Sequence, residues 1–166
     1  MVRFFLGFLV LQAARFGVEL TPWAQEYFVV PWTNTLAAAS AWLVTLFDPK
    51  VIATGKVLLS TVNGFAVSIE AGCNGVEATI VLVAAMLAFP ASWQRKLVGL
   101  AVGIAAVQGL NVIRVISLFY LGQWNFDAFD FAHHYVWQAL IMLDVLIVWL
   151  LWVRTLPRAL PRPAIA

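Results

Sequence analysis

The sequence predicts an all-α polytopic membrane protein: a single integral membrane domain with about four transmembrane helices, one interfacial or re-entrant helix and a small extracytoplasmic β-hairpin. Composition is the first observation behind this prediction. Of the 166 residues, 63% are hydrophobic and 11% are charged, whereas soluble domains carry about 25% charged residues. The second observation is a succession of long apolar runs, and the third is eight tryptophans, which fit a bilayer protein with interfacial anchors.

Two apolar runs open the chain. The first, residues 2–20, is long enough to cross a hydrocarbon core of about 30 Å. A cleaved signal peptide is the alternative, but the run is long for one and no clean cleavage site follows, so we expect a retained helix. The second, residues 32–47, is short and rich in Thr, Ser and Asn. We expect an interfacial or re-entrant helix there.

The middle of the chain changes character. Residues 51–69 have no helical period, and Asn63-Gly64 separates two alternating stretches. Asn-Gly between such stretches is the strongest short-range hairpin signal, so we expect an extramembrane hairpin over residues 56–70 that leads to the only cysteine, Cys73. Strongly apolar segments follow it, and we expect transmembrane helices at 74–90, 97–121 and 132–153, then a tail at 154–166.

Basic residues set the expected orientation, because cytoplasmic loops carry an excess of Lys and Arg. Arg95 and Lys96 follow the helix expected at residues 74–90, whereas the loop of residues 123–131 has no basic residue. We therefore expect the Arg95 loop in the cytoplasm and Cys73 on the extracytoplasmic side of a cytoplasmic (inner) membrane. The tail, also expected inside, carries Arg154, Arg158 and Arg162.

The N-terminal charge bears on the second run. If Arg3 marks a cytoplasmic N-terminus, the first helix runs outward, and residues 32–47 cannot cross again before Cys73. Five full spans would place the N-terminus outside, which the positive charge of Arg3 disfavours.

Three polar groups from different helices are expected at one level of the membrane. Cys73 lies at the outer start of its helix, and His133-His134 opens the last one. Arg114 precedes Gly122 by eight residues, which places it about 12 Å from the outer helix end at 1.5 Å per residue. The antiparallel topology brings all of them to the outer side.

These residue types support acyl transfer through a thioester. A cysteine thiolate attacks a peptide carbonyl, a histidine takes and returns the proton, and a guanidinium stabilises the oxyanion. The helix N-terminus that Cys73 is expected to cap, a nearby His⁺ and Arg114 would each lower the pKa of the thiol. The remaining candidates are supporting residues: Asn74, Glu77, Asn111 and Asp144.

Each residue also has a purely structural interpretation. A lone cysteine usually behaves as a small buried hydrophobe, and an interfacial histidine is often only a polar anchor. Arg114 could pair with Glu77 or Asp144, although intramembrane ions are functional by default. A single cysteine excludes an internal disulfide, a CxxC pair and a thiolate zinc cluster. We expect no cofactor and no metal, and the net charge of +2 does not suggest a nucleic-acid partner.

Helical phase favours His133 over His134 as the general base. Eleven steps of about 100° separate His133 from Asp144 and leave an offset of roughly 20°, whereas the offset from His134 is roughly 80°. An intramembrane aspartate should face the bundle interior. His133 is therefore expected to point towards the helices of Cys73 and Arg114, with His134 as the alternative.

Three motifs carry a family resemblance: Glu-Ala-Gly-Cys-Asn-Gly-Val-Glu at 70–77, Asn-Val-Ile-Arg at 111–114, and Ala-His-His-Tyr-Val-Trp-Gln at 132–138. With them, the sequence from about residue 20 to 153 resembles the exosortase/archaeosortase family. The compact length and the segment at 119–124, Phe-Tyr-Leu-Gly-Gln-Trp, look most like exosortase H.

The resemblance implies a multispan cysteine transpeptidase with a Cys, Arg and His active site. By motif, Cys73 corresponds to the nucleophile, Arg114 to the arginine, and the first histidine, His133, to the histidine. Such enzymes act on exported proteins that carry a C-terminal sorting motif, a transmembrane helix and a basic tail. They cleave near the motif through an acyl-enzyme and pass the acyl group to an acceptor. Larger family members have more helices than this chain, which limits what the resemblance implies about the acceptor.

Three other functions fit the residues. An intramembrane thiol protease would use water as acceptor, and the mass of the released product separates it from a transpeptidase. An ion or proton carrier would use Arg114, Glu77, Asp144 and the histidines, but it makes no use of Cys73 and needs an oligomer. A non-catalytic membrane adaptor is the third, and the reactivity of Cys73 towards a thiol probe distinguishes it from the enzymes.

Overall fold

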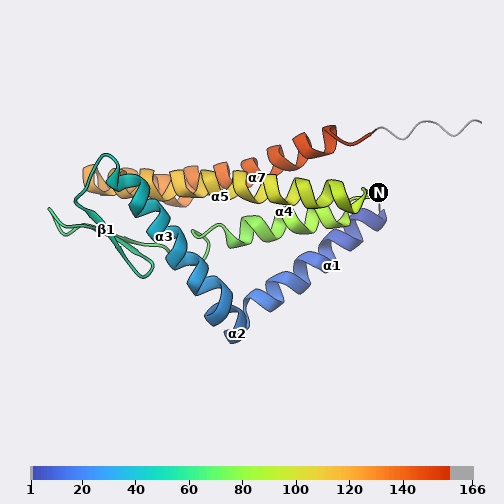
Figure 1. Ribbon diagram of the computed structural model, residues 1–166, viewed down its shortest axis with the longest axis horizontal. Coiled ribbons are helices and arrows are strands. Elements are labelled where there is room, and N and C mark those ends of the chain that lie inside the picture. Colours follow the sequence, from blue (N-terminus) through green and yellow to red (C-terminus); the bar gives the residue numbers. More distant parts are fainter. Residues whose placement is uncertain (1, 158–166) are drawn as a thin grey trace, which may run out of the picture.

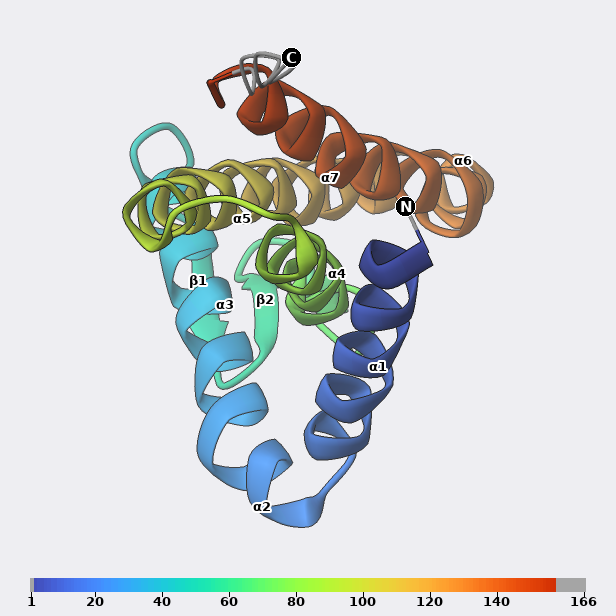
Figure 2. The same cartoon turned by 90° about the vertical axis from the view of Figure 1, so that its right-hand side faces the viewer.

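The computed structural model describes residues 2–157 and is a helical bundle with a small sheet at one end (Figure 1). Helices α5 (Trp93–Trp124) and α7 (Trp137–Arg154) run side by side, and α4 (Val76–Ala88) packs against both. Helix α1 (Val2–Glu19) packs on α4. Helix α3 (Val30–Thr45) leans away from α1, so that the two form the legs of a V (Figure 2).

Two helical segments of the described chain are long and apolar enough to cross a membrane. One is α5, with a mean hydropathy of 1.7, and the other is Phe126–Arg154, with 2.2. The second segment runs without a gap through α6 (Phe126–Phe131), the π-helical turn η2 (Ala132–Val136) and α7. Both begin earlier than the expected 97–121 and 132–153. The expected 123–131 loop is therefore wrong.

The turn between these helices needs one residue. Asn125 has an extended backbone, and its side-chain oxygen accepts a hydrogen bond from the backbone N–H of Ala128. An asparagine at such an N-cap satisfies one of the donors that a helix start leaves free. This cap lets α6 start directly after α5. The polar residues between 123 and 131 had instead indicated a loop.

The helix expected at residues 2–20 is present as α1, but it and the second helix form the two arms of the V rather than separate elements. After α1, Thr21 caps the short helix α2 (Pro22–Ala24), and the π-helical turn η1 (Gln25–Val29) leads into α3. The second helix thus begins well before residue 32, and Pro31 is accommodated in the first turn of α3, where a missing N–H costs little. The arms Phe4–Glu19 and Pro22–Thr45 meet at 72° and together fit one broken span or a re-entrant loop.

The four full spans expected from the sequence are not all found among residues 2–157. Helix α4 has 13 residues, which gives about 20 Å at 1.5 Å per residue, against a hydrocarbon core of about 30 Å. Length and composition support two helices that cross the membrane, or three if the V counts as one span. Part of the expected tail, with Arg158 and Arg162, lies outside the described residues.

The sheet lies at the end of the bundle that carries Cys73. Strands β1 (Val51–Thr54), β2 (Val57–Ser60) and β3 (Ala66–Ser68) pair antiparallel in the order β1-β2-β3. The Asn63-Gly64 turn joins β2 to β3, so the expected hairpin is confirmed, while β1 was missed. Its turn to β2 is short and uses Gly55, whose φ of 57° suits glycine.

Two groups of buried side chains hold these layers together. One lies between α3, the sheet and α5 and includes the fully buried Leu58 and Phe119. The other lies between α4, α5 and α7 and includes Leu82 and Met86. The segment that carries Cys73 connects the sheet to α4.

Candidate active site

Cys73 lies in the loop that joins β3 to α4, three residues before the helix begins. The loop turns through two glycines with left-handed backbones, Gly72 with φ 83° and Gly75 with φ 72°. Cys73 N donates to Glu70 O at 2.9 Å. The N–H of Val76 at the start of α4 is bound by the Asn74 side chain at 3.0 Å. The expectation that Cys73 caps the helix is therefore wrong, because the N-cap residue of α4 is Gly75 and the side chain that binds the first N–H of the helix is that of Asn74.

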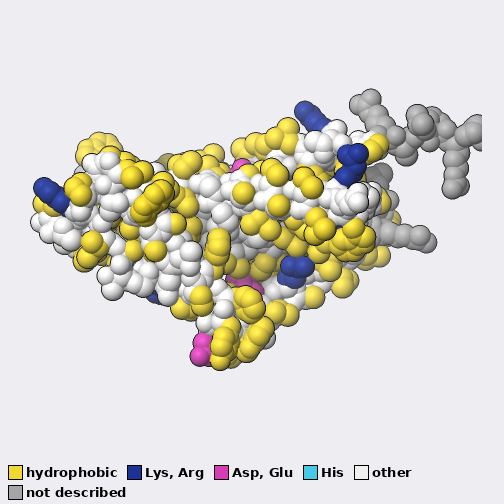
Figure 3. Space-filling view, in the orientation of Figure 1, with side chains coloured by type: hydrophobic (Ala, Val, Ile, Leu, Met, Phe, Trp, Pro, Cys, Tyr) yellow, Lys and Arg dark blue, Asp and Glu magenta, His cyan; other side chains and the backbone are white. Residues whose placement is uncertain are grey.

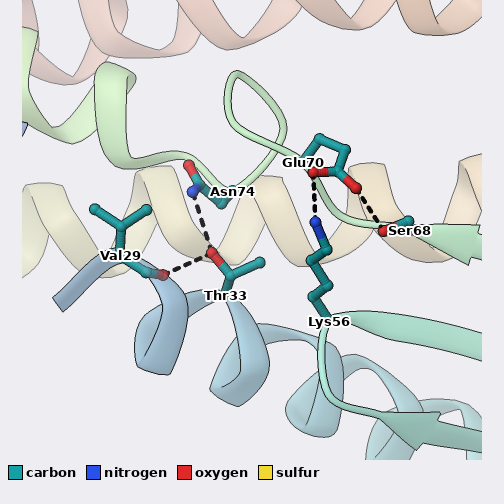
Figure 4. Close-up of polar contacts among 6 residues, drawn as sticks. All are labelled: Val29, Thr33, Lys56, Ser68, Glu70 and Asn74. Atoms are coloured by element: carbon teal, nitrogen blue, oxygen red, sulfur yellow. Dashed lines mark hydrogen bonds and ion pairs between the residues drawn. The ribbon is translucent and has the colours of Figure 1, made fainter. Parts of the chain in front are cut away.

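Asn74 also fixes the loop to α3 (Figure 4). Its Nδ2 donates to Thr33 Oγ1 at 3.1 Å, and the Thr33 hydroxyl donates in turn to Val29 O at 2.7 Å. On its backbone side, Asn74 O accepts from Trp32 Nε1 at 3.2 Å. Asn74 is 1% exposed, so these bonds are shielded from water and hold the loop firmly.

The other end of the loop is tied to the sheet. Glu70 accepts from Lys56 Nζ at 2.6 Å and from Ser68 Oγ at 2.7 Å (Figure 4). These hydrogen bonds, first that of Lys56 and then that of Ser68, lower the pKa of the Glu70 carboxyl. The pair is exposed to solvent, so it orients the loop rather than contributing much to stability.

Three side chains from different elements meet at the sulfur of Cys73. His133 Nε2, from η2, lies 3.6 Å from Sγ. Arg114 Nη2, from α5, donates to the same Sγ at 3.4 Å, and Nη1 of the same guanidinium donates to Gly72 O at 3.3 Å. Arg114 is 1% exposed. The structure thus brings together the three residues that the sequence singled out.

The resting form of Cys73 follows from its surroundings. Burial raises the pKa of the thiol, and the positive charge of Arg114 only partly offsets this, while Glu77 and Glu70 raise it further. The expectation of a lowered pKa is therefore not met. A neutral thiol needs a base to remove its proton at the moment of attack, and His133 is the group within reach.

The two neighbouring histidines have different environments. The ring of His133 stacks on Phe129, with centroids 5.6 Å apart and planes at 25°. His134 instead points to Asp130, whose backbone oxygen and carboxylate lie 3.0 and 3.1 Å from its Nδ1, and it is exposed. The phase argument for His133 assumed a regular α-helix, but η2 is π-helical, so the 100° step does not apply there.

The other supporting candidates, Glu77, Asn111 and Asp144, have different surroundings. Glu77 Oε1 accepts from Gly72 N at 2.6 Å, so it holds the loop and forms no ion pair with Arg114. Asn111 is fully buried, without a hydrogen-bond partner, and its Nδ2 would lie 3.0 Å from a Cβ at Gly75. Asp144 forms no hydrogen bond or ion pair with the three residues around the sulfur, and its Oδ2 is buried without a partner.

Sequence reasoning missed the residues that position the site. Phe129 orients His133, and its place four residues before that histidine, one helical turn away, is the signal that could have found it. Thr33 and Trp32 hold Asn74, and their position in a short polar-looking helix was a further sign. Gly72 offers its N–H to Glu77 and its carbonyl to Arg114. No cluster of His, Cys, Asp or Glu within residues 2–157 has the form of a metal site.

A family model described as transmembrane exosortase matches residues 1–152. No curated protein and no solved structure matches the chain. The matched range includes Cys73, Arg114 and His133 together with all the segments that position them.

Proposed function

Because the chain belongs to the transmembrane exosortase family, we propose that it is a membrane-embedded cysteine transpeptidase. It cleaves the C-terminal sorting signal of exported proteins through a thioester with Cys73 and transfers the exported part to an acceptor. The observation that carries this proposal is the position of one sulfur atom, 3.6 Å from His133 Nε2 and 3.4 Å from Arg114 Nη2.

The first half of the reaction forms the acyl-enzyme. His133 Nε2 takes the proton from Sγ as the sulfur attacks the carbonyl carbon of the scissile peptide bond. The carbonyl oxygen becomes an oxyanion, which the guanidinium of Arg114 stabilises. When the tetrahedral intermediate collapses, the C–N bond breaks and His133 returns the proton to the leaving amine. The sorting signal departs, and the exported protein is held as a thioester on Cys73.

The second half reverses these roles. An acceptor nucleophile loses its proton to His133, attacks the thioester carbonyl and expels the thiolate, which His133 reprotonates. The acceptor is an amine, a lipid, a glycan or, if the enzyme works as a protease, water. Arg114 again faces the oxyanion, so the same three side chains serve both steps.

The supporting residues hold this geometry. Glu77 and Arg114 bind the N–H and the carbonyl of the same glycine, Gly72, next to the nucleophile. Asn74 ties the loop to α3. We place the site on the extracytoplasmic side of the cytoplasmic membrane, because the end of the bundle away from Cys73 carries Arg95 and Arg154.

Replacement of the nucleophile tests the proposal. Cys73→Ser should insert and fold but process a sorting-signal protein several orders of magnitude more slowly, since a hydroxyl is far less ionised than a thiol. Cys73→Ala should leave it unprocessed. Processing is followed by mass spectrometry in a strain that co-expresses the substrate, and the product mass distinguishes transfer from hydrolysis. Substantial processing by Cys73→Ala would refute the thioester mechanism.

A further inference from the structure

A second concave site lies far from Cys73, between α5 and α7. The helices diverge towards the end where α5 begins (Figures 1 and 2) and leave a groove of about 590 Å³. Val98, Val102 and Leu151 form its walls and are 55 to 66% exposed. An apolar hollow of this kind on a membrane protein faces lipid tails rather than water.

Close helix packing forms the inner wall of the groove. Trp152 lies across Gly99, where an added Cβ would come within 2.2 Å of the indole Nε1, and that nitrogen donates to Arg95 O at 3.1 Å. Gly103 similarly leaves no room for a Cβ beside Leu82. Both glycines therefore pack closely against side chains of neighbouring helices, and the side chains next to them on α5 line the groove.

The mouth of the groove is positively charged. Arg95 is exposed there, with Nη1 donating to Thr155 O at 3.0 Å, and it has no carboxylate partner in the described part of the chain. The first turn of α5 contains no acidic residue, and Ser92 gives it no side-chain cap, so its N–H groups add positive potential. Arg154 ends α7 nearby. In the space-filling view, basic side chains at this end adjoin hydrophobic surface (Figure 3).

The length of the groove indicates whether its ligand is a lipid or a transmembrane helix. It runs along α5 from Arg95 to Ala106, which is about 16 Å at 1.5 Å per residue. That is about half of the 30 Å hydrocarbon core and so the depth of one leaflet. A transmembrane peptide would need a groove through both leaflets. A basic sorting-signal tail would also be repelled by Arg95.

We propose that this groove binds one anionic phospholipid, with an acyl chain along Val98 and Val102 and the phosphate at Arg95 and the first turn of α5. Basic pockets between transmembrane helices are suited to such head groups. The lipid belongs to the leaflet on the Arg95 side, away from Cys73. The proposal does not depend on the proposed enzymatic activity, because the site and its ligand are separate from the three residues at the sulfur.

Native mass spectrometry of the purified full chain tests this proposal. The protein in detergent receives equal amounts of dioleoyl phosphatidylglycerol and dioleoyl phosphatidylcholine. Wild type should retain phosphatidylglycerol about fivefold more than phosphatidylcholine, the ratio expected for one basic residue near a head group. Arg95→Gln should bring the two lipids to near-equal retention, whereas Arg15→Gln, which removes an exposed charge from α1, should keep the preference.

A second pair of variants tests the acyl-chain wall. Ala106→Trp fills the inner end of the groove and should reduce retention of both lipids, while Ala105→Trp, exposed on α5 but outside the groove, should not. Val102→Trp replaces Ala106→Trp if the latter does not purify as a monodisperse protein. Equal retention of both lipids by wild type, an unchanged preference in Arg95→Gln, or equal losses in both alanine variants would each overturn the proposal. So would unchanged lipid retention in Ala106→Trp with weaker binding of a synthetic sorting-signal helix.

Discussion

Replacement of Arg114 by lysine tests whether the site needs two separate donor atoms. Nη1 and Nη2 donate to Gly72 O and to Cys73 Sγ at 3.3 and 3.4 Å, from a side chain that is 1% exposed. A lysine ammonium is a point charge on a flexible stem and cannot reproduce this fork. Loss of one hydrogen bond to a charged group costs about 1.5–3 kcal/mol, so Arg114→Lys should lower kcat/KM about 10- to 150-fold.

Arg114→Gln provides the comparison, because it also removes the positive charge. Loss of an oxyanion donor costs about 100- to 1,000-fold in kcat, so we expect activity to fall in the order arginine, lysine, glutamine. Single-turnover cleavage of a purified sorting-signal protein, followed by mass spectrometry, measures this order. Size-exclusion profiles establish that each variant is folded, and Arg15→Lys on α1 is the matched control. Near-normal turnover in Arg114→Lys would show that charge alone suffices and would refute the two-donor reasoning.

Three further predictions follow from the site. His133→Ala should reduce processing about 100- to 10,000-fold, as for loss of a general base, while His134→Ala should keep most of it; the reverse pattern in a co-expression assay would assign the base to His134. Because the pKa of Cys73 is raised, the rate of its alkylation by maleimide should increase with pH well into the alkaline range. Glu77→Gln removes a nearby negative charge and should increase this rate. A rate that reaches its plateau near neutral pH would indicate a preformed thiolate. An impermeant maleimide should label Cys73 in intact cells, and labelling only after lysis would contradict the extracytoplasmic placement.

Local chemistry explains which elements the sequence could predict. Asn63-Gly64 fixes a tight turn whatever surrounds it, so the β2–β3 hairpin was predictable. Strand β1 was not, because its pairing with β2 depends on packing against α3. The start of α5 at Trp93 and the Asn125 turn were missed, since polar residues near a membrane surface fit a helix end and a loop equally well.

The three residues at the sulfur were predictable from their chemistry, whereas their supports were not. The chain has a single cysteine and two histidines, and an arginine within an apolar helix is rare, so these residues stand out. Phe129 and Trp32 are aromatic residues in a protein with many, and only the fold shows that they position His133 and Asn74. The direction of the Cys73 pKa shift also depended on the fold, because burial is not visible in the sequence.

His133 belongs to the last long helical segment of the described chain, and this position has a consequence for biosynthesis. Cys73 and Arg114 are 41 residues apart, but His133 follows Cys73 by 60 residues. Since a ribosome adds about 5–20 residues per second, the thiol and the arginine exist for seconds before the proposed base is made. In the proposed mechanism, the nascent chain therefore carries the thiol without its base through membrane insertion. The proposed site is complete only when the segment from Phe126 to Arg154 docks.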